Sequence, residues 1–328
     1  ALLCGSSTLH AQDFKLTSSG YFKNQGVDVM AFDDIYPEGH QGGVCIIMNG
    51  HRVATNGDIR LEATPGQWQP VPKQLDRKLG DNSITATLCY PDSSRHLTGF
   101  NPMIYPDLHL IYTVNVESKG KNIEVTVDLD RPIPQEFIGK VGFNLEFFPG
   151  SLFGKPWIMD GQSGIFPQQP NSPLMTTQPN YLHTGNYHDG KKSLADMDKL
   201  IGKGYSPIVA DDIISEPYAK GTKFTSRPDD PYNKVTIESL SGDLQLFDGR
   251  MNHNNGWFVL RSNIKPGVTK GAVKWIITPN VVADWMYQPV IQTSQIGYHP
   301  TQDKEAVIEM DIRDNRKETA QIIRIDAD

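Results

Sequence analysis

The chain has 328 residues, and its 38 carboxylates outnumber its 31 Lys and Arg residues to give a net charge of -7. This length favours two domains over one, and the acidic balance excludes nucleic acid as an expected partner, because phosphate neutralisation requires a basic stripe. A hydrophobic content of 38% with 29 Gly and 23 Pro indicates a turn-rich globular protein, and no apolar stretch is long enough to predict a membrane span.

The first eleven residues run from apolar to small side chains, which is typical of a signal peptide that ends at a cleavage site after Ala11. We therefore expect residues 1–11 to be a signal-peptide remnant and the protein to be exported to the periplasm or the extracellular space. Lipid anchoring through Cys4 is the less favoured alternative, because Leu3 occupies the position where that processing prefers a small residue.

Export permits disulfide bonds. Cys45 and Cys89 both lie in apolar strand patterns, where they could form a disulfide or remain buried free thiols. The sequence leaves both alternatives open.

Nearly every element predicted between residue 13 and residue 285 is a strand. Asn49-Gly50 and Asn56-Gly57 each predict a two-residue hairpin turn. The predicted strands cover residues 27–32, 43–48, 58–62, 83–90, 109–118, 123–130, 141–148, 234–240, 244–247, 256–264 and 271–278. So many antiparallel strands cannot form one flat sheet, and they are expected to stack as a sandwich or close as a barrel.

Residues 149–232 form a long segment rich in Pro, Gly, Asn and Asp, in which one helix is predicted from Ser193 to Ile201. An irregular segment of this length inside a compact domain usually has a function or covers a sheet. Any ligand contact is therefore expected here.

Residues 290–310 carry the most specific motif of the chain, SQIGYHP at 294–300, followed by an alternating strand at 305–312 and a third predicted strand at 319–325. The motif resembles the opening strand of the immunoglobulin-like module that precedes the catalytic domain in family 9 glycoside hydrolases. Such a module needs about 100 residues, so the resemblance implies that only its first part is present. The alternative is a further hairpin of one large domain.

The resemblance extends to the large N-terminal β-domain that some bacterial enzymes of this family carry. The matching segments are GDIRL at 57–61, TPGQW at 64–68, GFNLEF at 142–147, MDG at 159–161 and NGWFV at 255–259. This resemblance implies an all-β fold: a large galactose-mutarotase-like β-supersandwich at residues 12–287, followed by the truncated start of an immunoglobulin-like β-sandwich at residues 288–328.

Family 9 enzymes invert the anomeric centre with two carboxyl groups, and the family's Asp-Ala-Gly-Asp base motif is absent from this sequence. Three pairs of adjacent acids lie beside turn residues, and we interpret them as solvated loop acids: Asp33-Asp34, Asp211-Asp212 and Asp229-Asp230. We therefore expect no catalytic residue and no cofactor, a bracing role for an exported β-glucan-degrading enzyme, and as partners the C-terminal catalytic domain of the same polypeptide and β-glucan.

Two alternatives come from other classes of protein. A stand-alone carbohydrate-active enzyme, a mutarotase or lyase, could pair Glu146 with His183 or His188 as acid and base. A carbohydrate-binding module is the other alternative. A metal site is not expected, because the spacings of His40, His51, His96 and His109 match no compact zinc signature.

Aromatic side chains are the candidates for weak carbohydrate binding, because sugar rings stack on them. Trp157, Trp68 and Tyr187 are the predicted contacts, whereas Trp257 and Trp275 alternate with apolar neighbours and are expected in the core. For Trp157 the alternative is that the indole plugs the sheet beneath the loop.

Overall fold

The computed structural model describes residues 13–33, 42–66, 69–90, 93–95, 105–170, 174–176, 213–251, 256–315, 319, 321 and 323. The chain divides into two compact units, Ala1–Ala283 and Asp284–Asp328. The described residues form strands and four 3-10 turns: η1 (Ser93–Arg95), η2 (Gln135–Phe137), η3 (Pro149–Ser151) and η4 (Gly249–Met251). No helix among them is long and apolar enough to cross a bilayer.

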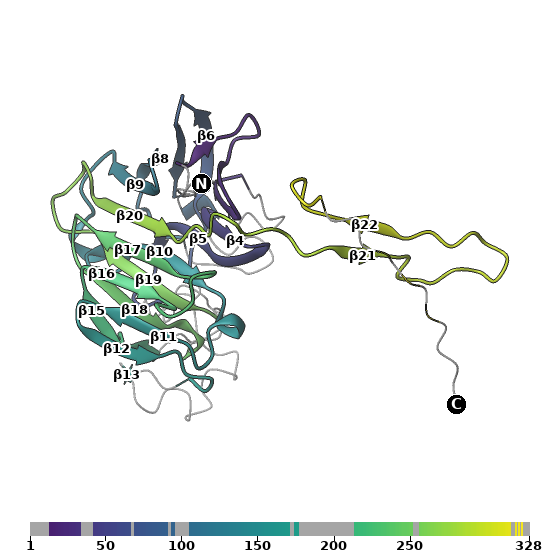
Figure 1. The fold of residues 1–328 in the computed structure, drawn as a ribbon. Coiled ribbons are helices and arrows are strands. Elements are labelled where there is room, and N and C mark those ends of the chain that lie inside the picture. Colours follow the sequence, from purple (N-terminus) through teal and green to yellow (C-terminus); the bar gives the residue numbers. More distant parts are fainter. Residues whose placement is uncertain are drawn as a thin grey trace, which may run out of the picture. The chain divides into compact units, whose positions relative to one another are not determined.

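The first unit contains two nine-stranded sheets within the described residues (Figure 1). The first sheet has the order β1 (Lys15–Leu16), β2 (Phe22–Asn24), β3 (Val27–Ala31), β4 (Val44–Met48), β5 (His51–Leu61), β10 (Val141–Phe147), β19 (Phe258–Asn263), β18 (Leu244–Asp248) and β15 (Ala219–Gly221). The second sheet has the order β12 (Gln162–Ile165), β11 (Pro156–Met159), β16 (Lys223–Ser226), β17 (Val235–Ser239), β20 (Val273–Pro279), β9 (Asn122–Leu129), β8 (Ile111–Lys119), β7 (Ser83–Cys89) and β6 (Lys73–Leu79). A small sheet pairs β13 (Leu174–Thr176) with β14 (Ile213–Ser215).

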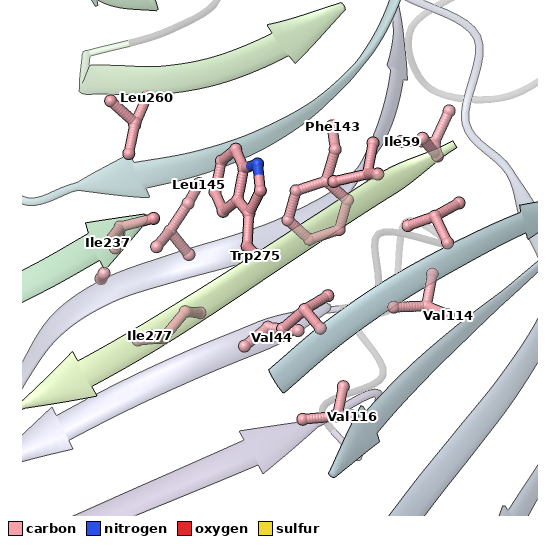
Figure 2. Close-up of a cluster of buried hydrophobic side chains, with 14 of the residues drawn as sticks. Val44, Ile59, Val114, Val116, Phe143, Leu145, Ile237, Leu260, Trp275 and Ile277 are labelled. Carbon is pink, nitrogen blue, oxygen red and sulfur yellow. The ribbon is translucent and has the colours of Figure 1, made fainter. Parts of the chain in front are cut away.

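The two large sheets pack face to face around one apolar core (Figure 2). Phe143 of the first sheet meets Trp275 of the second edge to face, with 5.0 Å between the ring centroids. The buried Trp275 indole also donates a hydrogen bond to Ser262 Oγ at 3.0 Å, which satisfies its N–H inside the core. The prediction of an all-β, two-sheet sandwich is confirmed, as is the core position of Trp275.

The two sheets differ in how their central strands are buried. On β9 buried apolar residues alternate with half-buried polar ones, so one face packs on the core while the other meets solvent. On β10 all seven residues are buried, and β5 and β19 are buried along most of their length. The central strands of the first sheet are therefore covered on both faces.

The two Asn-Gly pairs behave differently. Asn49 and Gly50 both have positive φ (53° and 82°) and join β4 to β5, which confirms the first predicted hairpin turn. The second prediction is wrong, because Asn56 (φ 54°) and Gly57 lie inside β5, where the pairing with β10 shifts register. The pair therefore forms a bulge. Gly57 approaches β4 so closely that an added Cβ would lie 2.6 Å from Val44 Cβ, so only glycine fits at position 57.

No disulfide bond joins Cys45 on β4 to Cys89 on β7. Of the two alternatives left open by the sequence, the structure therefore does not show the Cys45–Cys89 disulfide. Trp257, expected in the core, is half-buried and contacts Phe148 edge to face at 4.4 Å.

The second unit contains one described hairpin, in which β21 (Val290–Gln292) pairs with β22 (Val307–Glu309). Every residue of these two strands is exposed. Of the third strand expected at residues 319–325, only residues 319, 321 and 323 are described, and none of them lies in a strand. The predicted domain limits stay predictions, and the signal-peptide remnant and the helix predicted from Ser193 to Ile201 lie outside the described residues.

Candidate functional site: a buried polar cluster

Six polar residues lie on the central strands of the first sheet, or directly after one of them, and are almost completely buried. We call them the polar cluster: Asn144 (0% exposed), Asp58 (1%), Arg261 (1%), Glu62 (2%), Arg60 (3%) and Glu146 (4%). Asn144 stands at the middle of the sheet, opposite Asp58 on β5 and opposite Arg261 on β19. The cluster therefore spans three neighbouring strands.

Strand alternation explains why these side chains gather there. On β10 the apolar Phe143, Leu145 and Phe147 point into the core, so Asn144 and Glu146 point to the opposite face. The same alternation places Leu260 in the core and Arg261 on the opposite face of β19. The polar cluster thus occupies the second face of the first sheet, away from the core.

One half of the cluster is a closely bonded ion pair. Arg261 Nη1 lies 3.3 Å from Glu62 Oε1 and donates to Asn144 Oδ1 at 3.2 Å. Asn144 Nδ2 in turn donates to Glu62 Oε1 at 2.6 Å, and Arg261 Nε donates to Asn263 Oδ1 at 2.7 Å. The Glu62 carboxylate and the Arg261 guanidinium are therefore each held by two strands.

The other half of the cluster contains Arg60 and Glu146. Arg60 Nη2 lies 4.0 Å from Glu146 Oε1, which is an ion pair but too long for a hydrogen bond. Asn56 Nδ2, held at the bulge in β5, donates to Glu146 Oε2 at 2.6 Å. Arg60 Nε is buried without a hydrogen-bond partner, so Arg60 relies on electrostatic attraction more than Arg261 does.

Two tyrosines near one end of the second sheet donate hydrogen bonds to β5. Tyr112 Oη donates to Asp58 Oδ1 at 3.0 Å, and Tyr90 Oη donates to the Ile59 carbonyl at 2.9 Å. Burial, together with the nearby Asp58 carboxyl, raises the pKa of both phenols well above its usual value. Both tyrosines are therefore neutral hydrogen-bond donors at physiological pH.

Burial also governs the charged members of the cluster. Loss of hydration raises the pKa of Asp58 to about 6, although Arg60 opposes the shift. The same cause raises the pKa of Glu62 to about 7, against the opposing effects of Arg261 and Arg60. Burial disfavours the charge of Arg60, but Glu146, Asp58 and Glu62 outweigh it and raise the pKa of its guanidinium.

Enzymes that transfer protons often use carboxyl groups whose pKa is raised and which lie beside a charged group such as a guanidinium. In this structure, however, no cluster residue is more than 4% exposed, so these side chains are closed off from solvent. Near the end of β5, Thr64 Oγ1 donates to the Ser215 carbonyl of β14 at 2.9 Å, so the small sheet lies against this part of the chain. The geometry is that of a sealed network that joins three strands.

Glu146, the acid considered for a mutarotase-type reaction, belongs to this cluster, whereas His183 and His188 lie outside the described residues. The other members were not singled out in the sequence. Their signal was present, because Asp58, Arg60 and Glu62 alternate with apolar residues on one strand, as Asn144 and Glu146 do on another. Polar residues at alternating positions usually indicate a solvated face, and here that face is buried.

Of the three predicted carbohydrate contacts, Trp157 is among the described residues. Trp157 is only 7% exposed and lies across Gly164 of the neighbouring strand, where an added Cβ would be 2.5 Å from Trp157 Cζ2. This burial agrees with the alternative that the indole plugs the sheet. Trp68 and Tyr187 lie outside the described residues, so their role stays a prediction.

Among the described residues, no group of three His, Cys, Asp or Glu side chains is arranged to hold a metal ion. His51 and His109, two of the four histidines considered for such a site, are exposed. His40 and His96 lie outside the described part of the chain.

No protein-family model and no curated protein sequence matches this chain. Among solved structures, it is similar to a galactose mutarotase-like protein from Lactobacillus casei ATCC 334, at 10% identity and a TM-score of 0.36, over 79% of this chain and 98% of that one. A galactose mutarotase related enzyme from Lactobacillus acidophilus gives 8% identity and a TM-score of 0.35, over 79% and 96%. The heparan sulfate lyase HepC from Pedobacter heparinus gives 10% identity and a TM-score of 0.29, over 89% of this chain and 40% of that one.

At these identities and scores the likeness assigns no activity. The functional argument therefore rests on the geometry of the two units.

Proposed function

We propose that the chain is a non-catalytic N-terminal part of an exported, β-glucan-degrading family 9 glycoside hydrolase. In this proposal the large sandwich braces a catalytic domain that follows it in the same polypeptide. The sequence resemblance of residues 290–310 to the immunoglobulin-like module of that family supports the proposal, and one observation carries it.

That observation is the exposure of apolar side chains in the second unit. Ile296 is 99% exposed, Ile312 98%, Val307 66% and Ile291 60%. Isolated two-stranded hairpins are marginally stable in water, and contiguous exposed apolar side chains mark interaction surfaces. An immunoglobulin-like sandwich covers such side chains with its second sheet. The proposal therefore assigns β21 and β22 to the first part of that sandwich.

Two substitutions test this assignment. Ile291 and Ile308 lie directly opposite each other in the hairpin, so the double change Ile291→Thr and Ile308→Thr removes apolar surface from one of its faces. We expect less self-association in analytical ultracentrifugation and an unchanged melting temperature of the sandwich. A large fall in that melting temperature would show that the hairpin belongs to the core of the first unit, and would contradict the proposal.

Activity assays test the non-catalytic role. We expect no release of reducing sugar from carboxymethylcellulose, xyloglucan or mixed-linkage glucan, because the sequence lacks the Asp-Ala-Gly-Asp base motif of the family. Hydrolysis that survives repurification and is abolished by Glu146→Gln would refute this role.

A second candidate is a stand-alone sugar-active enzyme of the mutarotase type. The observation that favours it is the incomplete pairing of Arg60, whose Nε has no hydrogen-bond partner and whose nearest carboxylate oxygen, on Glu146, is 4.0 Å away. Sugar hydroxyls bind well to such a guanidinium and carboxylate pair. The burial of both residues opposes this candidate, and polarimetry of freshly dissolved glucose or galactose with the wild-type protein tests it.

A further inference from the structure

The sandwich has two open sides, where the edge strands of one sheet face those of the other. Among the described residues, β15 and β12 end the two sheets on one side, and β1 and β6 end them on the other. Gln162 of β12 donates to the Lys220 carbonyl of β15 at 3.2 Å, which joins the first of these sides. On each side an arginine, Arg250 or Arg77, donates to main-chain carbonyl groups in or next to the opposite sheet.

Arg250 is held firmly from several directions. It lies in η4, directly after β18 of the first sheet, and its Nη1 and Nη2 donate to the Gln168 and Pro167 carbonyls, both at 2.8 Å, just after β12 of the second sheet. Asp248, which is 0% exposed, balances the charge by accepting from Arg250 Nε and Nη2, both at 2.9 Å. The guanidinium also lies 4.4 Å from the centroid of the Phe258 ring. Charge-assisted, bidentate pairs of this kind are the strong ones.

The chain itself crosses between the sheets on the Arg250 side. β15 of the first sheet ends at Gly221, and β16 of the second sheet begins at Lys223. The Asp160 carboxylate holds this crossing, because it accepts from the Thr222 N–H at 2.6 Å and from the Lys223 N–H at 2.9 Å. The two sheets are therefore joined covalently at this side through a single connecting residue.

Arg77 joins the other side less firmly. From β6 its Nε donates to the Ala31 carbonyl at 2.9 Å, and its Nη2 donates to the Gly20 carbonyl at 2.6 Å, both in the β1–β3 region of the first sheet. Its ion-pair partner is Asp33, at 3.8 Å and with 41% of its side chain exposed. An exposed pair of this kind contributes little, so Arg77 lacks the buried counter-charge that Arg250 has.

The remaining contacts on the Arg77 side are also non-covalent. The Phe14 N–H donates to the Gly120 carbonyl at 2.8 Å, and Ser118 Oγ donates to the Phe14 carbonyl at 2.8 Å. Arg77 lies 46 residues after Ala31 in the chain, with β4 and β5 between them. No short connection therefore restrains β6 against β1–β3 when these hydrogen bonds break.

We propose that the sandwich opens locally on its Arg77 side, with Arg77 as the latch and the crossing between β15 and β16 as the hinge. Breaking the two carbonyl contacts of Arg77 lets β1–β3 separate from β6, while Asp160 and Arg250 keep the opposite side closed. The device follows from the unequal closure of two equivalent sides of one fold. Such local opening is a normal property of folded proteins and draws on their least stable regions.

Native-state hydrogen exchange, read by mass spectrometry of peptides, tests the proposal. Arg77→Gln removes the latch, so we expect peptides that cover β1–β3 to exchange at least about tenfold faster, because each hydrogen bond lost involves a charged donor. Peptides that cover β15–β17 should keep their wild-type rates. Lys78→Gln is the matched control on the same strand, because Lys78 pairs with Asp76 at the surface, and it should leave both regions unchanged.

The wild-type protein supplies a measurement that does not depend on whether a variant folds. We expect its β2–β3 and β3–β4 amides to exchange faster than its β16–β17 amides. The double variant Arg250→Gln and Asp248→Asn, which leaves no buried charge unpaired within that pair, should accelerate exchange at β15–β17 and not at β1–β3. Equal wild-type rates on the two sides, or equal acceleration of both sides by Arg77→Gln, would overturn the proposal.

Discussion

The outer faces of the two large sheets differ in how deeply their polar side chains are buried. On β9 and β20 of the second sheet, buried and half-buried residues alternate, as in any antiparallel strand with one wet face. On β10 of the first sheet the outward residues are as buried as the inward ones, although they are polar and charged. The difference shows that a polar, alternating pattern in the sequence does not by itself mean a solvated face.

The consequence is energetic. A polar side chain on the wet face of β9 exchanges its hydrogen bonds with water, so its substitution changes little. A polar side chain on β10 has only protein partners, so its substitution leaves those partners unsatisfied. The comparison therefore predicts large effects for outward residues of the first sheet and small effects for those of the second.

Arg261→Gln should give the largest effect. The change leaves the Glu62 carboxylate without its 3.3 Å counter-charge in a site where it is 2% exposed. Breaking a buried ion pair from one side typically costs about 3 to 5 kcal/mol, which denaturant titration can measure. Arg131→Gln is the matched control, because Arg131 pairs with Asp130 at the surface and such pairs contribute about 1 kcal/mol or less. Equal losses in the two variants would show that the cluster is not sealed.

Trp157→Ala tests the interior of the sandwich. Removal of a buried indole costs about 3 to 5 kcal/mol, so we expect a fall of several degrees in the melting temperature. If the indole is a plug, retention on glucan in affinity electrophoresis stays the same. Loss of retention at an unchanged melting temperature would instead support the predicted sugar contact.

A pair of substitutions compares the two outer faces directly. Asn144→Ala on β10 removes the partner of both Glu62 and Arg261, and leaving such groups unsatisfied costs about 1 to 3 kcal/mol. Thr126→Ala on β9 changes a half-buried position on the wet face, and we expect a change within about 0.5 kcal/mol. Similar values for the two variants, measured by the same denaturant titration, would remove the distinction between the sheets.

The sequence predicted the strands well where alternation was regular. The strands expected at 123–130 and 141–148 correspond to β9 and β10 with one-residue differences at their ends. β6 was missed, because its sequence, KQLDRKL, is highly charged, as suits the exposed edge strand of a sheet. Asn56-Gly57 was misassigned as a turn, because the close approach of Val44 that makes it a bulge comes from a different strand.

The candidate site was only partly predictable for a similar reason. Glu146 was recognised as a strand acid, but its partners Arg60 and Asn56 lie some ninety residues earlier in the chain. Which outward faces are covered depends on tertiary packing, and no local pattern carries that information. Alternation shows that Glu146 lies opposite the core, but not that this opposite face is sealed.

The central claim is that the polar cluster holds the first sheet together and does not act on a sugar. Glu146→Gln tests it most directly when mutarotation and unfolding are measured on the same preparations. We predict that neither wild type nor variant accelerates mutarotation of glucose or galactose above the buffer rate. We also predict that the variant has a lower unfolding free energy than the wild type, because Arg60 loses its buried counter-charge and breaking a buried ion pair from one side typically costs about 3 to 5 kcal/mol. Acceleration by the wild-type protein that the variant abolishes, with the unfolding free energy unchanged, would contradict the claim.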